Sequence, residues 1–467
     1  MDNKITVKTQ LTFAFFQFCS VMAVTIPMMY LTFYLTESVG MSAALMGTVL
    51  LIARIVDFII GLVSGGVVEK SRMRWGTYRS WLIILKYVVF IGVCLQFWNT
   101  SSLPPVARGA VTIIGYIMMH GSMNFVSLAQ YGLIQRRAGS DMNGRAKLSI
   151  AYARGMTVAN IIISAVALPA VIWIGGFFPG YDYLITAAFF ALFFFIGSTV
   201  LVKATEEYDR VVTEEEAKKI PQISFKDMVK TAAGNGQLML VLLAFCLTYI
   251  GMFIVQTIMQ YYFVFIIGNQ LMMSVSLTAS MVFAFVGSIF GPIFGQKAGK
   301  KAALVTGMLL WGVFSALITF LAKGNVWIYI VLGGLGQVAF YMFFSFGMNY
   351  FLDAGEYGFY KTGKDNRNVA LAMYNMPMKV GMGLGGAIGS FGLAFIGYTS
   401  GMTQVTDAFV DKFMMLTGIV PAVFMFASGL LILFFWKITD ADAQKYATAN
   451  AEKLAAMAAQ TSDEKAS

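Results

Sequence analysis

Among the charged side chains inside long apolar stretches, four call for a chemical explanation. They are Arg54 and Asp57 in ARIVDFIIG, Arg154 in SIAYARGMTVAN and Lys379 in MYNMPMKVGMG. A charged side chain at the centre of a bilayer costs about 2.5–3.5 kcal/mol on insertion scales. A carboxylate in such a place can take up and release a proton or a cation, and a base there can face the path of a solute.

Simpler interpretations of the same residues stay open. Arg54 and Asp57 are three positions apart on one helical face, so they could form an ion pair that only fixes packing. Arg154 could extend from a helix end to the membrane interface. Lys379 lies far from both ends of its apolar stretch, and we expect it to face a central cavity.

The stretch YIMMHGSMNF carries the only histidine and two small polar residues. His120 could be a hydrogen-bonded core residue or a proton relay, and the sequence leaves both open. Ser122 and Asn124 partly share its face, so they could offer hydrogen bonds to a polar solute.

The amino-acid composition indicates that these residues belong to a membrane protein. Of the 467 residues, 58% are hydrophobic and 12% are charged, and the mean hydropathy is +0.73. A soluble domain carries about 25% charged residues. The net charge of +10 comes from Lys and Arg in short loops, which indicates membrane topology rather than nucleic-acid binding.

Twelve apolar runs are long enough to span a bilayer, which takes about 20 residues. We expect helices at 10–36, 41–68, 79–97, 106–133, 150–175, 183–203, 236–267, 272–296, 301–322, 326–352, 368–397 and 408–437. The sequence thus predicts an all-α integral membrane protein in four parts: an N-terminal six-helix bundle (1–203), a cytoplasmic central loop (204–235), a C-terminal six-helix bundle (236–440) and a cytoplasmic tail (441–467). Two related halves of six helices are typical of transporters that rock about a central site.

Basic residues in alternate loops predict the orientation. Lys and Arg gather at 70–79, 136–147, 297–301 and 361–367, whereas the intervening loops TESVGMS and GNQLMM have none. Basic loops face the cytoplasm, and an even number of spans then places both termini there.

Several of these stretches together resemble the glycoside–pentoside–hexuronide:cation symporters. ARIVDFIIG followed by SRMRWGTYRSW resembles that family's helix 2 and loop 2–3, and QYYFVFIIG is similar to its helix 7. DAGEYGFYKTG and KVGMGLGGAIGSFGLAFIGY are similar to its loop 10–11 and helix 11. The resemblance runs from about residue 30 to about residue 400 and implies the major facilitator fold, in a bacterial inner membrane.

The resemblance makes Asp57 the residue that couples transport to a cation. Asp57 matches the first carboxylate of the family's cation site, but the second carboxylate and a nearby asparagine are replaced by Gly61 and Ile60. A helix 4 threonine of that site is replaced by Met119. A hard cation such as sodium takes several oxygen ligands, whereas a proton needs one base. We therefore favour a co-transported proton, or no coupling, over sodium, and expect no cofactor or metal.

The resemblance also implies a substrate pocket. The acids that hold a galactoside in related carriers are replaced by Val21 and Ser122, and a tryptophan by Val126, while Arg154 and Lys379 match retained bases. Such a pocket favours a hexuronide or another anionic glycoside, although a neutral pentoside or oligosaccharide stays open. The other expected contacts are Tyr374, Asn375, Phe344, Ser122 and Asn124.

Charged residues of the basic loops could form a cytoplasmic gate. Loop arginines would pair with acids of helix 10 and loop 10–11 while the carrier faces outward, and these pairs would break when it faces inward. The expected members are Arg72, Arg145, Asp353 and Glu356. The alternative is that these charges only fix topology.

The sequence therefore predicts a secondary transporter of a sugar or glycoside that works by alternating access. It is not expected to be an enzyme, because no nucleophile arrangement, phosphate loop or metal-ligand spacing is present in it. The expected partners are a small sugar and the lipid bilayer, without nucleic acid, and the expected state is a monomer. Alternatives are a cation-independent sugar facilitator, a lipid flippase of the same fold, or a membrane receptor or scaffold.

Overall fold

The computed structural model describes residues 5–139, 141–211, 213 and 225–466. All regular secondary structure in this part of the chain is helical. Twelve of its helical stretches are long and apolar enough to cross a membrane. A helix satisfies its backbone N–H and C=O groups within itself, which is what a segment in hydrocarbon requires.

The spans follow one another closely along the chain. In order they are α1 (Val7–Glu37), α2 (Ala43–Glu69), α3 (Arg79–Gln96), α4 (Pro105–Tyr116) with η1 (Ile117–Gly121) and α5 (Ser122–Ala138), α6 (Met142–Gly175), α7 (Asp182–Ala204), α10 (Gly236–Tyr261) with η2 (Tyr262–Ile266), α11 (Leu271–Ala298), α12 (Lys300–Leu321), α13 (Val326–Phe344) with α14 (Gly347–Thr362), α15 (Arg367–Ala372) with η3 (Met373–Asn375) and α16 (Met376–Phe395), and α17 (Asp407–Thr417) with α18 (Ile419–Phe435). Two further helices, α9 (Phe225–Ala233) and α19 (Asp440–Ala466), lie outside the spans.

The twelve predicted runs correspond one to one with these spans, and the prediction of a twelve-helix fold is confirmed. The largest error concerns span ten, which was expected to end at residue 352 and continues as a helix to Thr362. Ala, Glu, Tyr and Lys in DAGEYGFYKT allow the helix to continue, and Gly363 ends it with a φ of 72°. Asp353 and Glu356 therefore lie on a helix and not in a loop.

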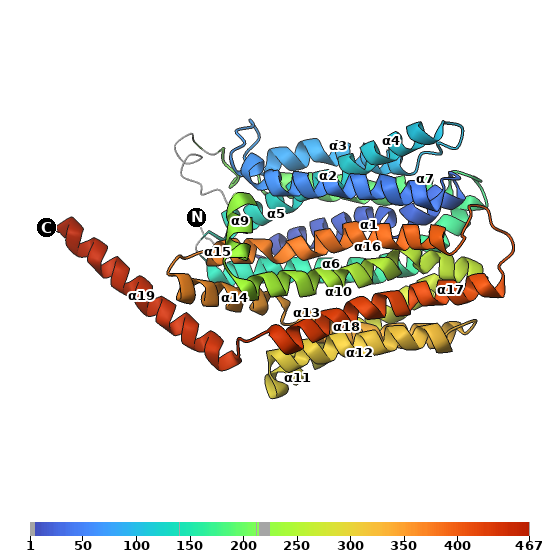
Figure 1. Cartoon of the computed structure of the whole chain (residues 1–467). Helices are drawn as coiled ribbons and strands as arrows, with labels where there is room; N and C mark the ends of the chain where they lie inside the picture. Colours follow the sequence, from blue (N-terminus) through green and yellow to red (C-terminus); the bar gives the residue numbers. More distant parts are fainter. Residues whose placement is uncertain (1–4, 140, 212, 214–224, 467) are drawn as a thin grey trace. The chain divides into compact units, whose positions relative to one another are not determined.

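One compact unit, here called unit 1, consists of Met1–Gln222, Gln256–Met281 and Gly386–Phe413. It contains the first six spans together with end segments of later ones. Within it α1 packs against α6 and α7 (Figure 1). Gly155 of α6 lies so close to the backbone of Ala14 in α1 that a Cβ would overlap it, so this close crossing requires glycine.

The other compact unit, unit 2, consists of Ile223–Val255, Val282–Gly385 and Met414–Ser467. Its α12 packs against α13 and α18, and α19 packs against α14. A capping box begins α19, because the Thr439 hydroxyl accepts from the Asp442 N–H (3.1 Å) while the Asp442 carboxylate accepts from the Thr439 N–H (3.1 Å).

Five of the described spans depart from regular α-helical geometry, among them span twelve, which breaks at Gly418 between α17 and α18. Span four contains the π-turn η1, and span seven ends in the π-turn η2. Span ten breaks between α13 and α14, and span eleven contains the 3₁₀ turn η3. Such interruptions free backbone groups and are frequent at binding sites of transporters. Polar residues near these interruptions are therefore candidates for the functional site.

Candidate functional site

A hydrogen bond between spans two and four holds the Asp57 carboxylate. Asp57 is 8% exposed on α2, and the Asn124 amide of α5 donates to its Oδ1 at 2.7 Å. The same amide nitrogen lies 3.3 Å from the carbonyl oxygens of His120 and Gly121 in η1. The π-turn therefore places Asn124 where its side chain bridges freed backbone carbonyls and a carboxylate from another span.

Arg54 belongs to the same cluster. Its side chain hydrogen-bonds to Tyr116 in α4, and the charges of Arg54 and Asp57 both act on that hydroxyl. The Tyr116 ring stacks on His120 with centroids 4.0 Å apart. Spans two and four thus bring together a carboxylate, a guanidinium, a phenol, an imidazole and an amide. This group of Arg54, Asp57, Tyr116, His120 and Asn124 is called the charged cluster below.

Glycine makes room for the Arg54 guanidinium. A Cβ on Gly386 of α16 would overlap it, so GLGGAIG presents a surface without side chains at this point. Gly386 belongs to unit 1, as does Arg54.

Hydrocarbon occupies positions where the resemblance would place oxygen ligands for a cation. Ile60 packs against Gly121, where an added Cβ would be 3.1 Å from Ile60 Cδ1. Met119, at the position of a threonine of that cation site, is fully buried. Val126 and Ser122, which replace expected sugar contacts, are also buried.

Arg154 lies in a separate groove of unit 1, about 490 Å³ in volume, between the first turns of α1 and the segment 151–158 of α6. The lining residues are Val7, Gln10, Leu11, Ala14, Phe15, Phe18, Ala151, Arg154, Gly155 and Val158. Within the described residues Arg154 makes no hydrogen bond or ion pair, and its side chain is exposed. Sequence reasoning missed Gln10, Phe15 and Phe18. The available signal was the polar pair Gln10 and Gln17 in an apolar run, since residues seven apart share a helical face.

The remaining expected substrate contacts belong to unit 2 and lie near its helix interruptions. Tyr374 and Asn375 are in η3, and Lys379 is half-buried one turn later in α16. The Tyr374 ring meets Phe351 edge-on at 5.4 Å. Phe344 ends α13, is 44% exposed and stacks on Phe340 at 5.5 Å. A polar and aromatic surface therefore gathers around the breaks in spans ten and eleven.

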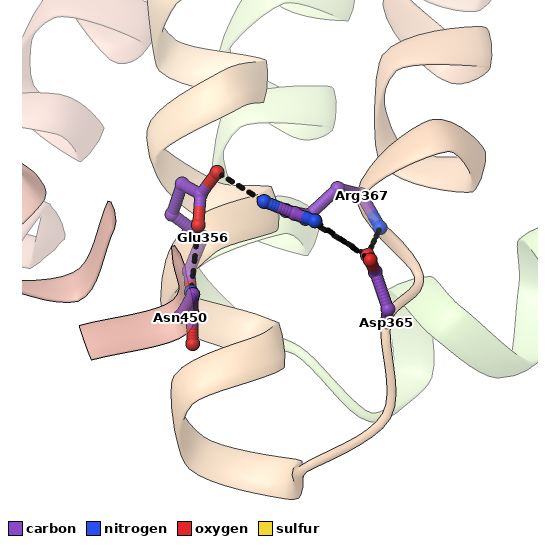
Figure 2. A network of polar contacts seen from close by, with 4 residues as sticks. All are labelled: Glu356, Asp365, Arg367 and Asn450. Atoms are coloured by element: carbon purple, nitrogen blue, oxygen red, sulfur yellow. Dashed lines mark hydrogen bonds and ion pairs between the residues drawn. The ribbon is translucent and has the colours of Figure 1, made fainter. Parts of the chain in front are cut away.

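The acids expected at the cytoplasmic gate have partners within unit 2. Asp353 pairs with Lys300 at 2.5 Å. Glu356 accepts from Arg367 at 3.0 Å and from the Asn450 amide at 2.6 Å, and Arg367 also pairs with Asp365 at 2.7 Å (Figure 2). This network ties α14, the turn before α15 and α19 together. The pairing of Asp353 and Glu356 with arginines of loop 2–3, expected while the carrier faces outward, stays a prediction.

The basic members of that gate lie in unit 1. Arg72 is exposed in the turn between α2 and α3. Arg145 donates from Nε to the Gly139 carbonyl at 2.9 Å, and its Nη2 contacts the same oxygen. Gly139 follows α5 with a φ of 57°, so Arg145 caps that helix end.

The stretch WGTYRSW is clamped to the residues that follow α7. Asp209 Oδ2 accepts from the backbone N–H of Tyr78 (2.9 Å) and of Arg79 (2.7 Å) at the start of α3. The buried Arg79 donates from Nε to the Val202 carbonyl at 2.9 Å. Burial raises the pKa of Asp209, while the two N–H donors oppose this rise. Sequence reasoning missed Asp209, whose partners are about 130 positions away.

A second polar cluster of unit 1 lies at the C-terminal end of α1, at the opposite end of the helices from the loop that joins α2 to α3. The hydroxyls of Thr36 and Tyr261 are 2.7 Å apart, and the Tyr261 hydroxyl also donates to the Thr32 carbonyl at 3.1 Å. The Tyr398 hydroxyl hydrogen-bonds to the Glu37 carboxylate. These residues, Thr32, Thr36, Glu37, Tyr261 and Tyr398, are called the hydroxyl cluster. They join α1 to segments from the second half of the sequence.

A sequence model of a family described as MFS/sugar transport protein matches residues 13–440. The isoprimeverose transporter of Lactiplantibacillus pentosus is 26% identical over 421 residues, 87% of this chain and 84% of that protein. The glucuronide carrier protein homolog of Escherichia coli (strain K12) is 22% identical over 422 residues, 88% of each chain. Among solved structures, the nucleoside transporter NupG shares the fold with a TM-score of 0.58 at 16% identity, covering 92% of this chain and 98% of that one.

Proposed function

Because the chain belongs to the MFS/sugar transport protein family, we propose that it moves an anionic glycoside, a hexuronide in particular, together with a proton by alternating access. Membership of the family makes it a multi-pass membrane transporter of sugars and not an enzyme. The observation that carries the coupling proposal is the buried Asp57 carboxylate held by Asn124.

Protonation of Asp57 changes the charge of the cluster. With Asp57 ionised, its negative charge offsets that of Arg54, and Asn124 donates a charge-assisted hydrogen bond to it. Proton uptake removes that charge and leaves Arg54 positive. Electrostatic interactions are strong in an apolar interior. A proton bound at Asp57 therefore favours the binding of an anionic solute, which is a physical basis for symport.

Sodium fits this site less well. A hard cation takes several oxygen ligands, and the residues facing span four around Asp57 include the hydrocarbon of Ile60. A proton needs only the carboxylate. This chemistry supports proton coupling over sodium coupling.

The bases support the preference for an anion. Arg154 lies in a groove with aromatic and amide neighbours, and its guanidinium can form two parallel hydrogen bonds to a carboxylate. Phe15 and Phe18 offer flat apolar faces that suit the C–H faces of a sugar ring. The glucuronide carrier homolog is a relative whose name is consistent with such a substrate.

The test uses the full-length protein in proteoliposomes with labelled glucuronide. An inward proton gradient should drive accumulation, and an uncoupler should abolish it, while a sodium gradient alone should have no effect. Accumulation that follows sodium would overturn proton coupling. Equilibration without accumulation would identify a cation-independent facilitator.

Substrate preference is tested separately by thermal unfolding of the purified protein. A ligand of the native state raises the melting temperature by mass action. We expect a phenyl glucuronide to raise it and phenyl glucoside, which lacks only the carboxylate, to have a smaller effect. Equal effects, or a larger effect of the neutral sugar, would contradict the anionic preference. Protection by lipid headgroups and by no sugar would favour a flippase.

The basic loops support a proposal about orientation. We propose that the protein is a monomer in a bacterial inner membrane, with both termini in the cytoplasm. Proteolysis of the tail in right-side-out and inside-out vesicles tests this orientation, because only the inside-out vesicles should expose α19.

A further inference from the structure

A second pocket of unit 1, about 720 Å³ in volume, shares no lining residue with the Arg154 groove. It lies between the first turns of α1, the C-terminal end of α5, and the end of α7 with the turn after it. The lining residues are Lys8, Thr9, Thr12, Phe13, Arg136, Arg137, Val200, Lys203, Ala204, Glu207 and Tyr208. Its volume is within the range of about 300–1,000 Å³ that small-ligand pockets occupy.

Basic side chains dominate this pocket. Four cations, Lys8, Arg136, Arg137 and Lys203, surround it with one acid, Glu207. The Arg137 guanidinium lies 5.4 Å from the ring centre of Tyr208, whose hydroxyl donates to the Ala204 carbonyl at 2.8 Å. An oriented guanidinium presents a planar fork of donors that matches the oxygens of a phosphate group.

Helix dipoles explain only part of this arrangement. Arg136, Arg137 and Lys203 are in the last turns of α5 and α7, where a cation is stabilised by the negative end of the helix. Lys8 is in the first turn of α1, where the dipole is positive and a cation is unfavourable. Lys8 therefore adds positive charge to a space that already holds three cations. A phosphate group in the pocket would offer acceptors to the ammonium groups of Lys8 and Lys203.

The pocket continues from an exposed apolar face of α7. Phe189, Leu192, Ile196 and Val200 recur at helical spacing with exposures of 54%, 46%, 51% and 38%. The same face leads into Lys203, Ala204 and Glu207, which line the pocket. In a membrane transporter such a face contacts acyl chains. The basic pocket is therefore located where the headgroup of a lipid on α7 would be.

We propose that this pocket binds the phosphate group of an anionic phospholipid whose acyl chains lie along α7. The phosphate oxygens accept from Arg137, Lys203 and Lys8, and the hydrocarbon covers Val200 and Ile196. A free phosphate ester shares the headgroup chemistry but would leave the apolar face of α7 uncovered. The proposal does not rest on the identity of the transported sugar.

The test measures thermal unfolding of delipidated full-length protein without any sugar. Three additives are titrated: phosphatidylglycerol, phosphatidylcholine with the same acyl chains, and soluble glycerol phosphate. The variant R137Q/K203Q removes two cations of the pocket. The matched control K70Q/R74Q removes one Lys and one Arg from the adjacent loop 2–3, outside the pocket. A second pair, K8Q/K203Q, serves if the first variant does not fold.

Phosphatidylglycerol should raise the melting temperature of the wild type and of K70Q/R74Q. R137Q/K203Q or K8Q/K203Q should need about tenfold or more lipid for the same rise, because charge-assisted hydrogen bonds are lost. An equal response of the pocket variants, or equal action of phosphatidylcholine, would overturn the proposal. Equal stabilisation by glycerol phosphate at the same concentration would make the site one for a soluble anion and overturn the lipid assignment.

Discussion

The charged cluster and the hydroxyl cluster of unit 1 differ in chemistry and in the origin of their residues. The charged cluster holds Asp57 and Arg54 deep within spans, and its residues come from spans two and four only. The hydroxyl cluster holds Thr36, Tyr261 and Tyr398 at helix ends. These residues come from both halves of the sequence.

We propose that this difference reflects two roles. Spans two and four belong to the same predicted bundle, so the contacts of the charged cluster can persist through a rocking motion. Contacts that join α1 to the end of α10 and to Tyr398 must break if the two halves separate at that end. The charged cluster therefore suits ion binding, and the hydroxyl cluster suits a latch of moderate strength.

Removal of Asn124 should have the largest effect on coupling. Asn124→Leu leaves the Asp57 carboxylate without its 2.7 Å donor, and a hydrogen bond to a charged group contributes about 1.5–3 kcal/mol. We expect proton-driven accumulation to fall by about tenfold or more. The matched control is Ser127→Ala on the exposed face of α5. Equal accumulation by Asn124→Leu and the control would remove the basis for distinguishing the two clusters.

Neutralisation of Arg154 should weaken binding of an anion without reducing coupling. Arg154→Gln should raise the half-saturating glucuronide concentration by about tenfold, because charge-assisted hydrogen bonds are lost. The effect on phenyl glucoside should be small. Lys70→Gln, which removes an exposed cation outside the groove, is the control. A similar loss for both sugars would show that Arg154 supports the fold and does not select charge.

A change in the hydroxyl cluster should have a smaller effect. It should shift the equilibrium between the closed and the open state at this end of the helices. Tyr261→Phe removes the hydroxyl that contacts Thr36 and the Thr32 carbonyl. Two neutral hydrogen bonds contribute about 1–3 kcal/mol, so we expect opening at this end to increase by about five- to 150-fold. The measure is the alkylation rate of Ser38→Cys in a background without Cys19, Cys94 and Cys246. Tyr87→Phe, an exposed tyrosine, is the control.

An unchanged alkylation rate in Tyr261→Phe would mean that the hydroxyl cluster is ordinary packing. A fall in sugar affinity without faster alkylation would place Tyr261 at the substrate. Either result would contradict the proposal that the hydroxyl cluster acts as a latch and so differs in role from the charged cluster.

The smallest expected effect concerns the Asp209 clamp and depends on pH. Burial raises the pKa of Asp209 above its ordinary value of 3.8, so the folded state holds the proton more tightly than the unfolded state. The wild type should therefore lose stability relative to Asp209→Asn as pH rises from about 3.8 through the raised pKa. Melting temperatures of both proteins across the acidic range measure this difference. A parallel pH dependence of the two would contradict it.

The sequence predicted the spans well because a membrane helix is marked by its own composition. Twenty apolar residues in a row need no knowledge of distant contacts. Asp57 could be recognised for the same reason, because it is a carboxylate between Val56 and Phe58 in an apolar run. No comparable sequence signal indicates the π-turn at Ile117–Gly121, although this turn orients Asn124 toward Asp57.

Long-range pairing accounts for most of what sequence reasoning missed. Asn124 was expected to face a solute, and its amide is found on Asp57, 67 positions away. Asp209 and Tyr261 were not singled out, because an acid in a polar loop or an aromatic at a helix end is common. Their partners, Arg79 and Thr36, become neighbours only when the helices pack.

Proton movement at the moment of sugar addition tests the central claim most directly. A pH-sensitive dye inside proteoliposomes should report acidification when glucuronide is added to the wild type or to Glu69→Gln, which lacks a carboxylate at the end of the same helix. In Asp57→Asn the dye signal should be absent while exchange of labelled for unlabelled glucuronide persists. Acidification of normal size in Asp57→Asn would contradict the account, because the coupled proton would then bind elsewhere.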